Sequence, residues 1–369
     1  MTVSDDRLGL ADPGRDFTPR PDALQRASAP PTDARQRASA MPTDARPGAL
    51  AGFGGARLRA PVALPVNADD LPRYLRATAA RADADDLATA HANCGIAIAA
   101  AARWKAPEAL AAAYSLRTSV ARRRGDLLAA DHDGETTSGL LDGDPRGEAA
   151  VLLLARRIAI RLDMGDVATA EKLLAGLDGE LPDVSSVLAL RYARGRLYAC
   201  TDRPGEGLAD LFFCGERLAA RQADRPNVLP WRSAAAAILV KTGTAEAATR
   251  LVAAEVELAR RAGPASALGR ALRIEGIVQP GAAGMESLAE AVRVLAPSPR
   301  RFEYAQALVD FGEALNVARR RPEARRVLRE ALELAGQCGS PVLVERARSG
   351  YALAGGKLRS PIPSPRDRP

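Results

Sequence analysis

Hydrophobic residues recur every three or four positions from Asp69 onward, with charged residues between them, and this spacing predicts amphipathic α-helices. Gly, Pro and Asp interrupt the pattern at short intervals, so we expect short turns between helices that pack antiparallel. The expected helices cover residues 69–82, 86–103, 107–123, 147–164, 167–177, 184–200, 205–221, 230–241, 245–262, 265–277, 284–295, 301–319, 322–337 and 341–354. Between residues 131 and 146, three glycines, a proline and several acids predict that one helix is degenerate.

Four of the expected helix pairs share one pattern of small and bulky residues. Gly312 is followed by Ala324, Leu328 and Ala331, and the offsets repeat in three other places. These are Gly195, Gly207, Leu211 and Cys214; Ala235, Ala247, Leu251 and Ala254; and, more weakly, Ile158, Ala170, Leu174 and Leu177. A small residue midway along the first helix lets the second helix cross close to it, and the leucine fills the gap to the next pair. This pattern is typical of tetratricopeptide repeats (TPRs).

The repeat predicts an all-α fold over residues 67–354, a TPR-like right-handed superhelix of antiparallel helix pairs (an α-solenoid). The long interval between the last two copies indicates another repeat around Leu272 and Leu288. Residues 1–66 contain few large apolar side chains and a tandem duplication, with Gln25–Arg35 followed at once by Gln36–Arg46, so a disordered tail is expected. Residues 355–369 are expected to form a disordered basic tail.

Composition agrees with helices, because 47% of residues are hydrophobic, mostly Ala and Leu, while only 4% are aromatic. The net charge of +7 arises from basic and acidic residues that are mixed along the helices, so we expect no direct DNA binding by this chain alone. No apolar run approaches the length of a membrane span and no signal peptide is recognisable, so the protein is expected in the cytoplasm, without a membrane partner. Four scattered cysteines are expected as buried thiols.

Motifs for catalysis are absent from the sequence. Gly356-Lys357 is followed by Leu358, so it is not a nucleotide-binding P-loop. His91 and Cys94 share a helix face, but two ligands do not make a metal site. We therefore expect no enzyme, no cofactor and no metal.

Several stretches resemble the helical region of LuxR-type large ATP-binding regulators, a branch of the STAND signalling ATPases. The more specific ones are Glu-Leu-Pro-Asp at 180–183 and Leu-Pro-Trp-Arg-Ser at 229–233; others lie at 192–197, 214–219, 305–312 and 320–325. The resemblance covers about residues 105–354. It implies a TPR-like sensor for an inducer or partner, in a family where a P-loop ATPase precedes this region and a helix-turn-helix follows it. Neither flanking domain is recognisable here, so ATP hydrolysis and DNA recognition do not carry over.

The first helices of the pairs should line the concave face of such an array, which makes their inward positions candidate ligand contacts. These candidates are Tyr192, Arg196, Arg232, Gln306, Glu313 and Asn316. A groove that mixes an aromatic ring with charges and amides suits a partner protein segment or a small inducer. The sequence thus predicts a non-catalytic binding and sensor module. The alternative is a degenerate or truncated regulator fragment without independent activity.

Overall fold

The computed structural model describes residues 63–141, 144–177, 179, 181, 184, 186–279 and 281–357. Every regular element in these ranges is helical, which confirms the predicted all-α class. A short 3-10 helix, η2, spans Ala68–Asp70. The α-helices are α4 (Leu71–Asp83), α5 (Leu87–Arg103), α6 (Pro107–Arg124), α7 (Leu127–Leu140), α8 (Glu148–Met164), α9 (Val167–Ala175), α10 (Val187–Tyr198), α11 (Pro204–Ala220), α12 (Trp231–Lys241), α13 (Ala245–Ala262), α14 (Ala265–Val278), α15 (Gly281–Leu295), α16 (Arg301–Val317), α17 (Arg321–Cys338) and α18 (Pro341–Leu353).

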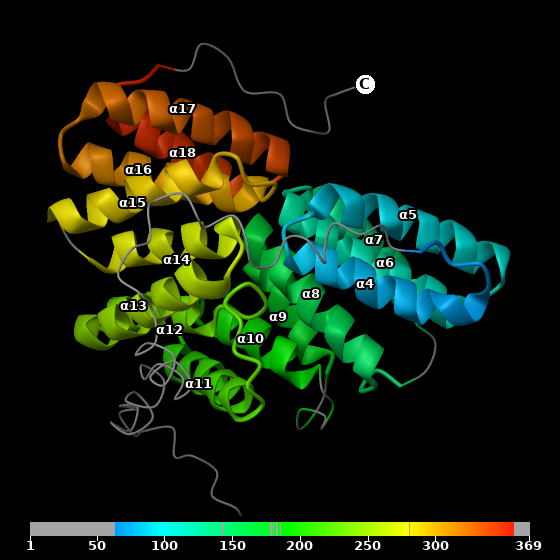
Figure 1. Cartoon of the computed structure of the whole chain (residues 1–369). Helices are drawn as coiled ribbons and strands as arrows, with labels where there is room; N and C mark the ends of the chain where they lie inside the picture. Colours follow the sequence, from blue (N-terminus) through cyan, green and yellow to red (C-terminus); the bar gives the residue numbers. More distant parts are fainter. Residues whose placement is uncertain are drawn as a thin grey trace, which may run out of the picture.

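These helices form seven sequential pairs, from α4–α5 to α16–α17, and α18 packs against the last pair (Figure 1). The first helix of each pair also contacts the first helix of the next pair, so the even-numbered helices make one continuous inner layer. The long N-terminal segment with the duplication and residues 358–369 lie outside the described residues. Within the described part of the chain, no helix has both the length and the apolar character that crossing a membrane needs.

The small residues of the repeat lie where two helices approach closely. A Cβ atom added to Gly312 would be 2.4 Å from Cγ of Leu328, and one added to Gly195 would be 2.9 Å from Cγ of Leu211. The leucine predicted to fill the gap therefore lies against the small residue in both copies. Glycine is required at these positions because any side chain would force the two helices apart.

The predicted additional repeat is the pair α14–α15. A Cβ atom on Gly276 would be 2.5 Å from Cγ of Leu288, the same contact as in the other copies. Leu288 follows its glycine at a shorter spacing than Leu328 follows Gly312, mainly because Gly276 lies closer to the end of α14 than Gly312 does to the end of α16. Leu272, Gly284, Leu288 and Ala291 nevertheless keep the offsets of the weaker copy at Ile158.

Bulky side chains fill the spaces between neighbouring pairs. Trp231 is only 2% exposed; a Cβ atom added to Gly215 would fall 2.5 Å from its ring, and the ring of Phe212 meets it edge to face. The tryptophan therefore packs between neighbouring pairs. Phe212 is buried, whereas Phe213 is half-buried beneath the guanidinium groups of Arg191 and Arg217, as expected for adjacent residues on one helix.

The expected degenerate helix at 131–146 is wrong for its first half, because α7 continues through Leu140. Asp133 is buried and accepts two hydrogen bonds from Arg117, at 2.7 and 2.6 Å, while Asp131 pairs with Arg161 at 2.7 Å. Gly134 lies against Arg157, where a Cβ atom would be 3.3 Å from Cγ. Asp131, Asp133 and Gly134 thus face the neighbouring helices, where arginines on α6 and α8 contact them.

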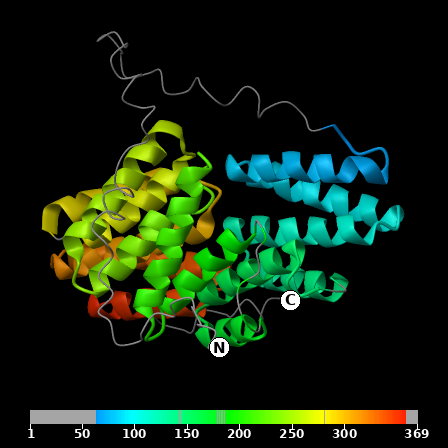
Figure 2. The same cartoon turned by 90° about the horizontal axis from the view of Figure 1, so that it is seen from below.

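The end of the array packs against its beginning. In the turn before α5, Asp85 accepts a hydrogen bond from Arg300 at 2.6 Å, and Ser340, before α18, donates to the carbonyl of Asp163 at 2.6 Å. Helix α16 also contacts α6, and α18 contacts α8 (Figures 1 and 2). The array is therefore closed into a ring, and its inner layer surrounds a central space instead of an open groove. The right-handed course of the superhelix stays a prediction.

Candidate functional site: a cationic central cavity

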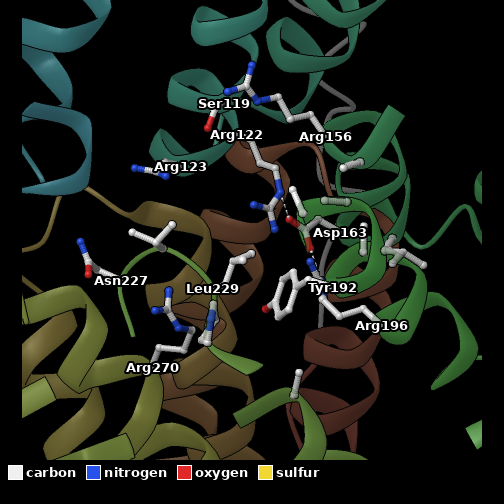
Figure 3. A pocket seen from close by; sticks show the side chains of 18 of the residues that line it. Ser119, Arg122, Arg123, Arg156, Asp163, Tyr192, Arg196, Asn227, Leu229 and Arg270 are labelled. Atoms are coloured by element: carbon white, nitrogen blue, oxygen red, sulfur yellow. Dashed lines mark hydrogen bonds and ion pairs between the residues drawn. The ribbon is translucent and has the colours of Figure 1, made fainter. Parts of the chain in front are cut away.

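A cavity of about 680 Å³ lies inside the ring. Its walls are the inner helices α4, α6, α8, α10, α12, α14 and α16, together with the segment 227–230 (Figure 3). Seven arginines line it, against four acidic residues. The arginines are Arg122, Arg123, Arg156, Arg196, Arg270, Arg273 and Arg300, and the acids are Asp83, Glu148, Asp163 and Glu303. The lining is therefore cationic.

Helical spacing explains how one face supplies both the space and the charges. On α8 the lining positions include Leu152, Ala155, Arg156 and Ala159, which lie on one face of the helix. The small alanine side chains leave space next to the helix backbone, whereas the long side chain of Arg156 extends along the cavity wall. On α10 the same spacing brings Tyr192 and Arg196, alternating with alanines, to the cavity.

On the wall between α6 and α10, the carboxylate of Asp163 forms ion pairs with two arginines. Asp163 lies 2.7 Å from Nε of Arg122 and 2.8 Å from Nη2 of Arg196, contacts drawn as dashed lines in Figure 3. Its side chain is 2% exposed, so water contributes little to its charge balance. This group of three side chains keeps a net positive charge.

A second network joins α14, α16 and the closing contact of the ring. Arg270 donates to Oε1 of Glu303 at 2.9 Å, and Arg300 lies 3.5 Å from the same oxygen while it binds Asp85. Burial alone would raise the pKa of Glu303, but the nearby charges, first Arg270 and then Arg300 and Arg122, outweigh burial and lower the pKa. Glu303 is therefore ionised at neutral pH.

Arg156 differs from the other arginines of the cavity. Arg123 pairs with Asp83 at 2.7 Å, whereas the guanidinium of Arg156 donates only to the hydroxyl of Ser115, and no carboxylate among the described residues pairs with it. Burial and the charge of Arg123 lower the pKa of Arg156 to about 10. It is still a cation at neutral pH, but a poorly compensated one.

Apolar and neutral groups complete the lining. Leu116, Leu188, Ile274 and Phe302 are buried residues that reach the cavity surface, and Tyr192 extends into it (Figure 3). Burial raises the pKa of Tyr192, although Arg196, Arg270 and Arg122 oppose the shift. Its hydroxyl is therefore protonated at neutral pH and can donate a hydrogen bond.

Three of the candidate residues predicted from the sequence, Tyr192, Arg196 and Gln306, line this cavity. Arg232 does not, because it is buried beside the Trp231 ring and pairs with Asp224 at 2.6 Å.

Glu313 and Asn316 lie elsewhere, at a second hollow of about 440 Å³ between α16 and α18. Glu313 accepts a hydrogen bond from Arg346 at 2.7 Å, and Asn316 donates to the carbonyl of Gly350 at 2.8 Å. The six candidate residues thus lie at three separate places: the central cavity, the surroundings of Trp231, and the hollow between α16 and α18.

Sequence reasoning missed Arg122, Arg123, Arg156 and Arg270. Four of the six candidates lie three residues before or one residue after the small first-helix residue of a stronger copy of the repeat, and α6 contains no such copy. Around Ile158, in the weaker copy, these two positions are Ala155 and Ala159, which line the cavity beside Arg156. The repeat pattern thus contained enough information to find the inward positions of α8. Nothing in the sequence showed that α6 and α16 would come into contact.

The cysteines and the possible metal ligands are scattered among the described residues. No group of three or more His, Cys, Asp or Glu is placed there to hold a metal ion. Cys94, Cys214 and Cys338 are buried, as predicted, and burial raises the pKa of each to about 12. The prediction is wrong for Cys200, which is exposed and lines the cavity just beyond α10.

Fold and site together define a class: an all-α array of helix pairs closed around a cationic cavity. No protein-family model matches the chain, and no curated protein matches it significantly. The resemblance to LuxR-type regulators stays a prediction.

Proposed function

We propose that this protein is a non-catalytic binding module that takes up a small molecule in its central cavity. The observation that carries this proposal is a cavity of about 680 Å³ walled by the inner helices of seven consecutive pairs. Binding sites for small molecules commonly have volumes of roughly 300–1,000 Å³ and combine apolar walls with a few converging polar groups. The resemblance to LuxR-type regulators supports a sensor, with a small inducer as its ligand.

A small molecule fits the site better than a partner protein does. An extended groove along an open array suits a peptide, but the contact of Asp85 with Arg300 closes this array into a ring. The inner layer therefore surrounds a compact space that a folded partner cannot occupy.

The position of the cavity suggests how binding would be sensed. Its walls come from both ends of the array, with Arg122 on α6 and Glu303 on α16 facing the same space. A ligand that touches both ends binds the closed ring better than any opened form and shifts the population toward it. It also stabilises the fold, by about 2.7 kcal/mol when its free concentration is 100-fold above its Kd.

The test is a thermal-shift screen of a low-molecular-mass cell extract against two variants. Ala237 lines the cavity on α12, so Ala237→Phe reduces the space, while Ala219→Phe adds the same ring at an exposed position on α11. We expect an extract fraction to raise the unfolding midpoint of the wild type and of Ala219→Phe but not of Ala237→Phe.

A shift that persists in Ala237→Phe would place the ligand outside the cavity and contradict the proposal. If no fraction shifts any of the three proteins, the result favours the alternative of a regulator fragment without independent activity.

A further inference from the structure

We propose that the ligand of this cavity is an organic anion, with an apolar body and a carboxylate or phosphate head held by Arg156, Arg122 and Arg123. This inference rests on the proposed function and adds the chemical class of the ligand. It is carried by the arrangement of charges, donors and apolar surface around the cavity.

The first observation is an imbalance of charge. Asp163 is shared between Arg122 and Arg196, and Arg156 pairs with no carboxylate among the described residues. Burying a cation without a counter-ion is unfavourable, so ring closure brings together charges that a bound anion would neutralise.

The second observation is that Arg122, Arg123 and Arg156 line the same wall of the cavity, where Asp163 pairs with Arg122, Asp83 pairs with Arg123 and Arg156 has no carboxylate partner among the described residues. Arg122 and Arg123 are neighbours on α6, and Arg156 reaches from α8 to Ser115 on that same helix. Figure 3 shows Arg122 extending to Asp163, with Arg123 and Arg156 at other points of the same wall. The charges of Arg123 and Asp83 are both felt at Arg156, and those of Arg300, Asp83 and Arg122 are felt at Arg123. An oxyanion bound at this wall would therefore be attracted by more than one guanidinium group.

The third observation is a set of buried donors without acceptors. Nη2 of Arg300 has no hydrogen-bond partner, although its side chain is 4% exposed, and Nε of Arg270 and of Arg273 also lack partners. Donors of this kind normally find an acceptor in a protein or in its ligand. Oxygen-rich anions supply several acceptors within a small volume.

The fourth observation concerns the part of the ligand beyond its charged head. Apolar side chains from four inner helices reach the cavity, among them Leu116, Leu152, Leu188 and Ile274. An inorganic anion would leave this surface without contacts. The ligand therefore has an apolar portion that occupies the space beside its charged head.

Two fluorescent probes with almost the same aromatic body test the inference. Anilinonaphthalene sulfonate carries one anionic head, whereas phenylnaphthylamine is neutral. We expect the wild-type protein to bind the sulfonate probe at least about tenfold more tightly, since charge-assisted hydrogen bonds distinguish the two probes. Displacement of the sulfonate probe by inorganic phosphate or by acetate then shows which head group the arginines prefer.

The matched variants are Arg156→Gln in the cavity and Arg250→Gln on the exposed surface of α13. Arg156→Gln is expected to weaken binding of the sulfonate probe by about tenfold or more and to leave the neutral probe unchanged. Its unfolding midpoint should be equal to or above that of the wild type, because the substitution removes a buried cation without a counter-ion. Arg250→Gln should bind both probes like the wild type.

Three results would overturn the inference. Equal affinity for both probes, lost in Ala237→Phe but unaffected by Arg156→Gln, would leave a ligand cavity without anion selectivity. A sulfonate signal that persists in Ala237→Phe would be surface binding. Failure of either probe to bind, together with an extract screen without a shift, would count against the cavity as a binding site altogether.

Discussion

The charged side chains in the interior of this protein differ in whether a group of opposite charge lies beside them, and its cysteines differ in whether they are buried. The carboxylates of Asp163, Asp133 and Asp210 are buried, and each is contacted by at least two guanidinium nitrogens. Such groups stabilise one geometry because leaving any of them unpaired would be costly. Two residues of the cavity differ from these: Arg156 is buried without a carboxylate partner among the described residues, and Cys200 is exposed, unlike the other cysteines.

Cys200 is expected to be the only cysteine that iodoacetamide modifies in the native protein at about pH 8. Because burial raises the pKa of Cys94, Cys214 and Cys338 to about 12, only about one in ten thousand of these thiols is ionised at that pH. Their thiolates become abundant only as the pH approaches 12. Intact-mass spectrometry should show one adduct on the native protein and four on the unfolded chain.

The control is Cys200→Ser, which should take up no reagent while native. Because Cys200 lines the cavity, the sulfonate probe should also slow its modification. Rapid modification of several cysteines in the native state would contradict the burial described above.

At the scale of helices, the spacing of small residues sets how closely the two members of a pair approach. Where glycine faces a neighbouring helix it permits a contact that alanine would prevent, and where it faces solvent it only weakens the helix. Gly312 is of the first kind and Gly95, in α5, is of the second, because no atom lies within 4 Å of an added Cβ.

We expect Gly95→Ala to raise the free energy of unfolding by about 0.5–1 kcal/mol, since alanine restricts the unfolded chain and favours the helix. Gly312→Ala should lower it by about 1–3 kcal/mol, because its methyl group would be 2.4 Å from Cγ of Leu328. Denaturant unfolding of both variants gives the comparison. Equal stabilisation by both would show that α16 and α17 are further apart than described.

At the scale of the whole molecule, the ring is closed by the packing of α16 on α6 and of α18 on α8, together with polar contacts at the turn between α4 and α5. Asp85 contributes two of them, since one oxygen accepts from Nε of Arg300 at 2.6 Å and the other from the backbone of Ser266 at 3.3 Å. Asn227 adds a hydrogen bond to the carbonyl of Asp83 at 2.9 Å. These contacts join the turn between α4 and α5 to the segment before α12, to α14 and to the start of α16. They thereby convert the concave face of the array into a cavity.

Asp85→Asn is expected to lower the stability by about 3 kcal/mol and to increase the radius of gyration, because it leaves the buried charge of Arg300 without its main partner. The backbone at this residue has φ 65°, a conformation that asparagine tolerates well, so the effect should come from the lost ion pair. Small-angle X-ray scattering and thermal unfolding measure the two changes.

The neighbouring Asp86→Asn is the control, since Asp86 pairs with Arg81 at 2.8 Å within the same turn and not across the ring. A radius of gyration that stays the same in Asp85→Asn would mean that other contacts hold the ring closed.

The all-α class, the helix pairs and the small positions at their crossings could be predicted from the amino-acid pattern, because they depend on contacts between residues near each other in the chain. The pattern also pointed to Tyr192, Arg196 and Gln306 as inward residues. Only the tertiary structure decided that the array closes and that Arg122 and Arg156 face Arg270 and Glu303 across one cavity. That outcome depends on the small rotation between successive pairs, which accumulates over the whole array and is encoded at no single position.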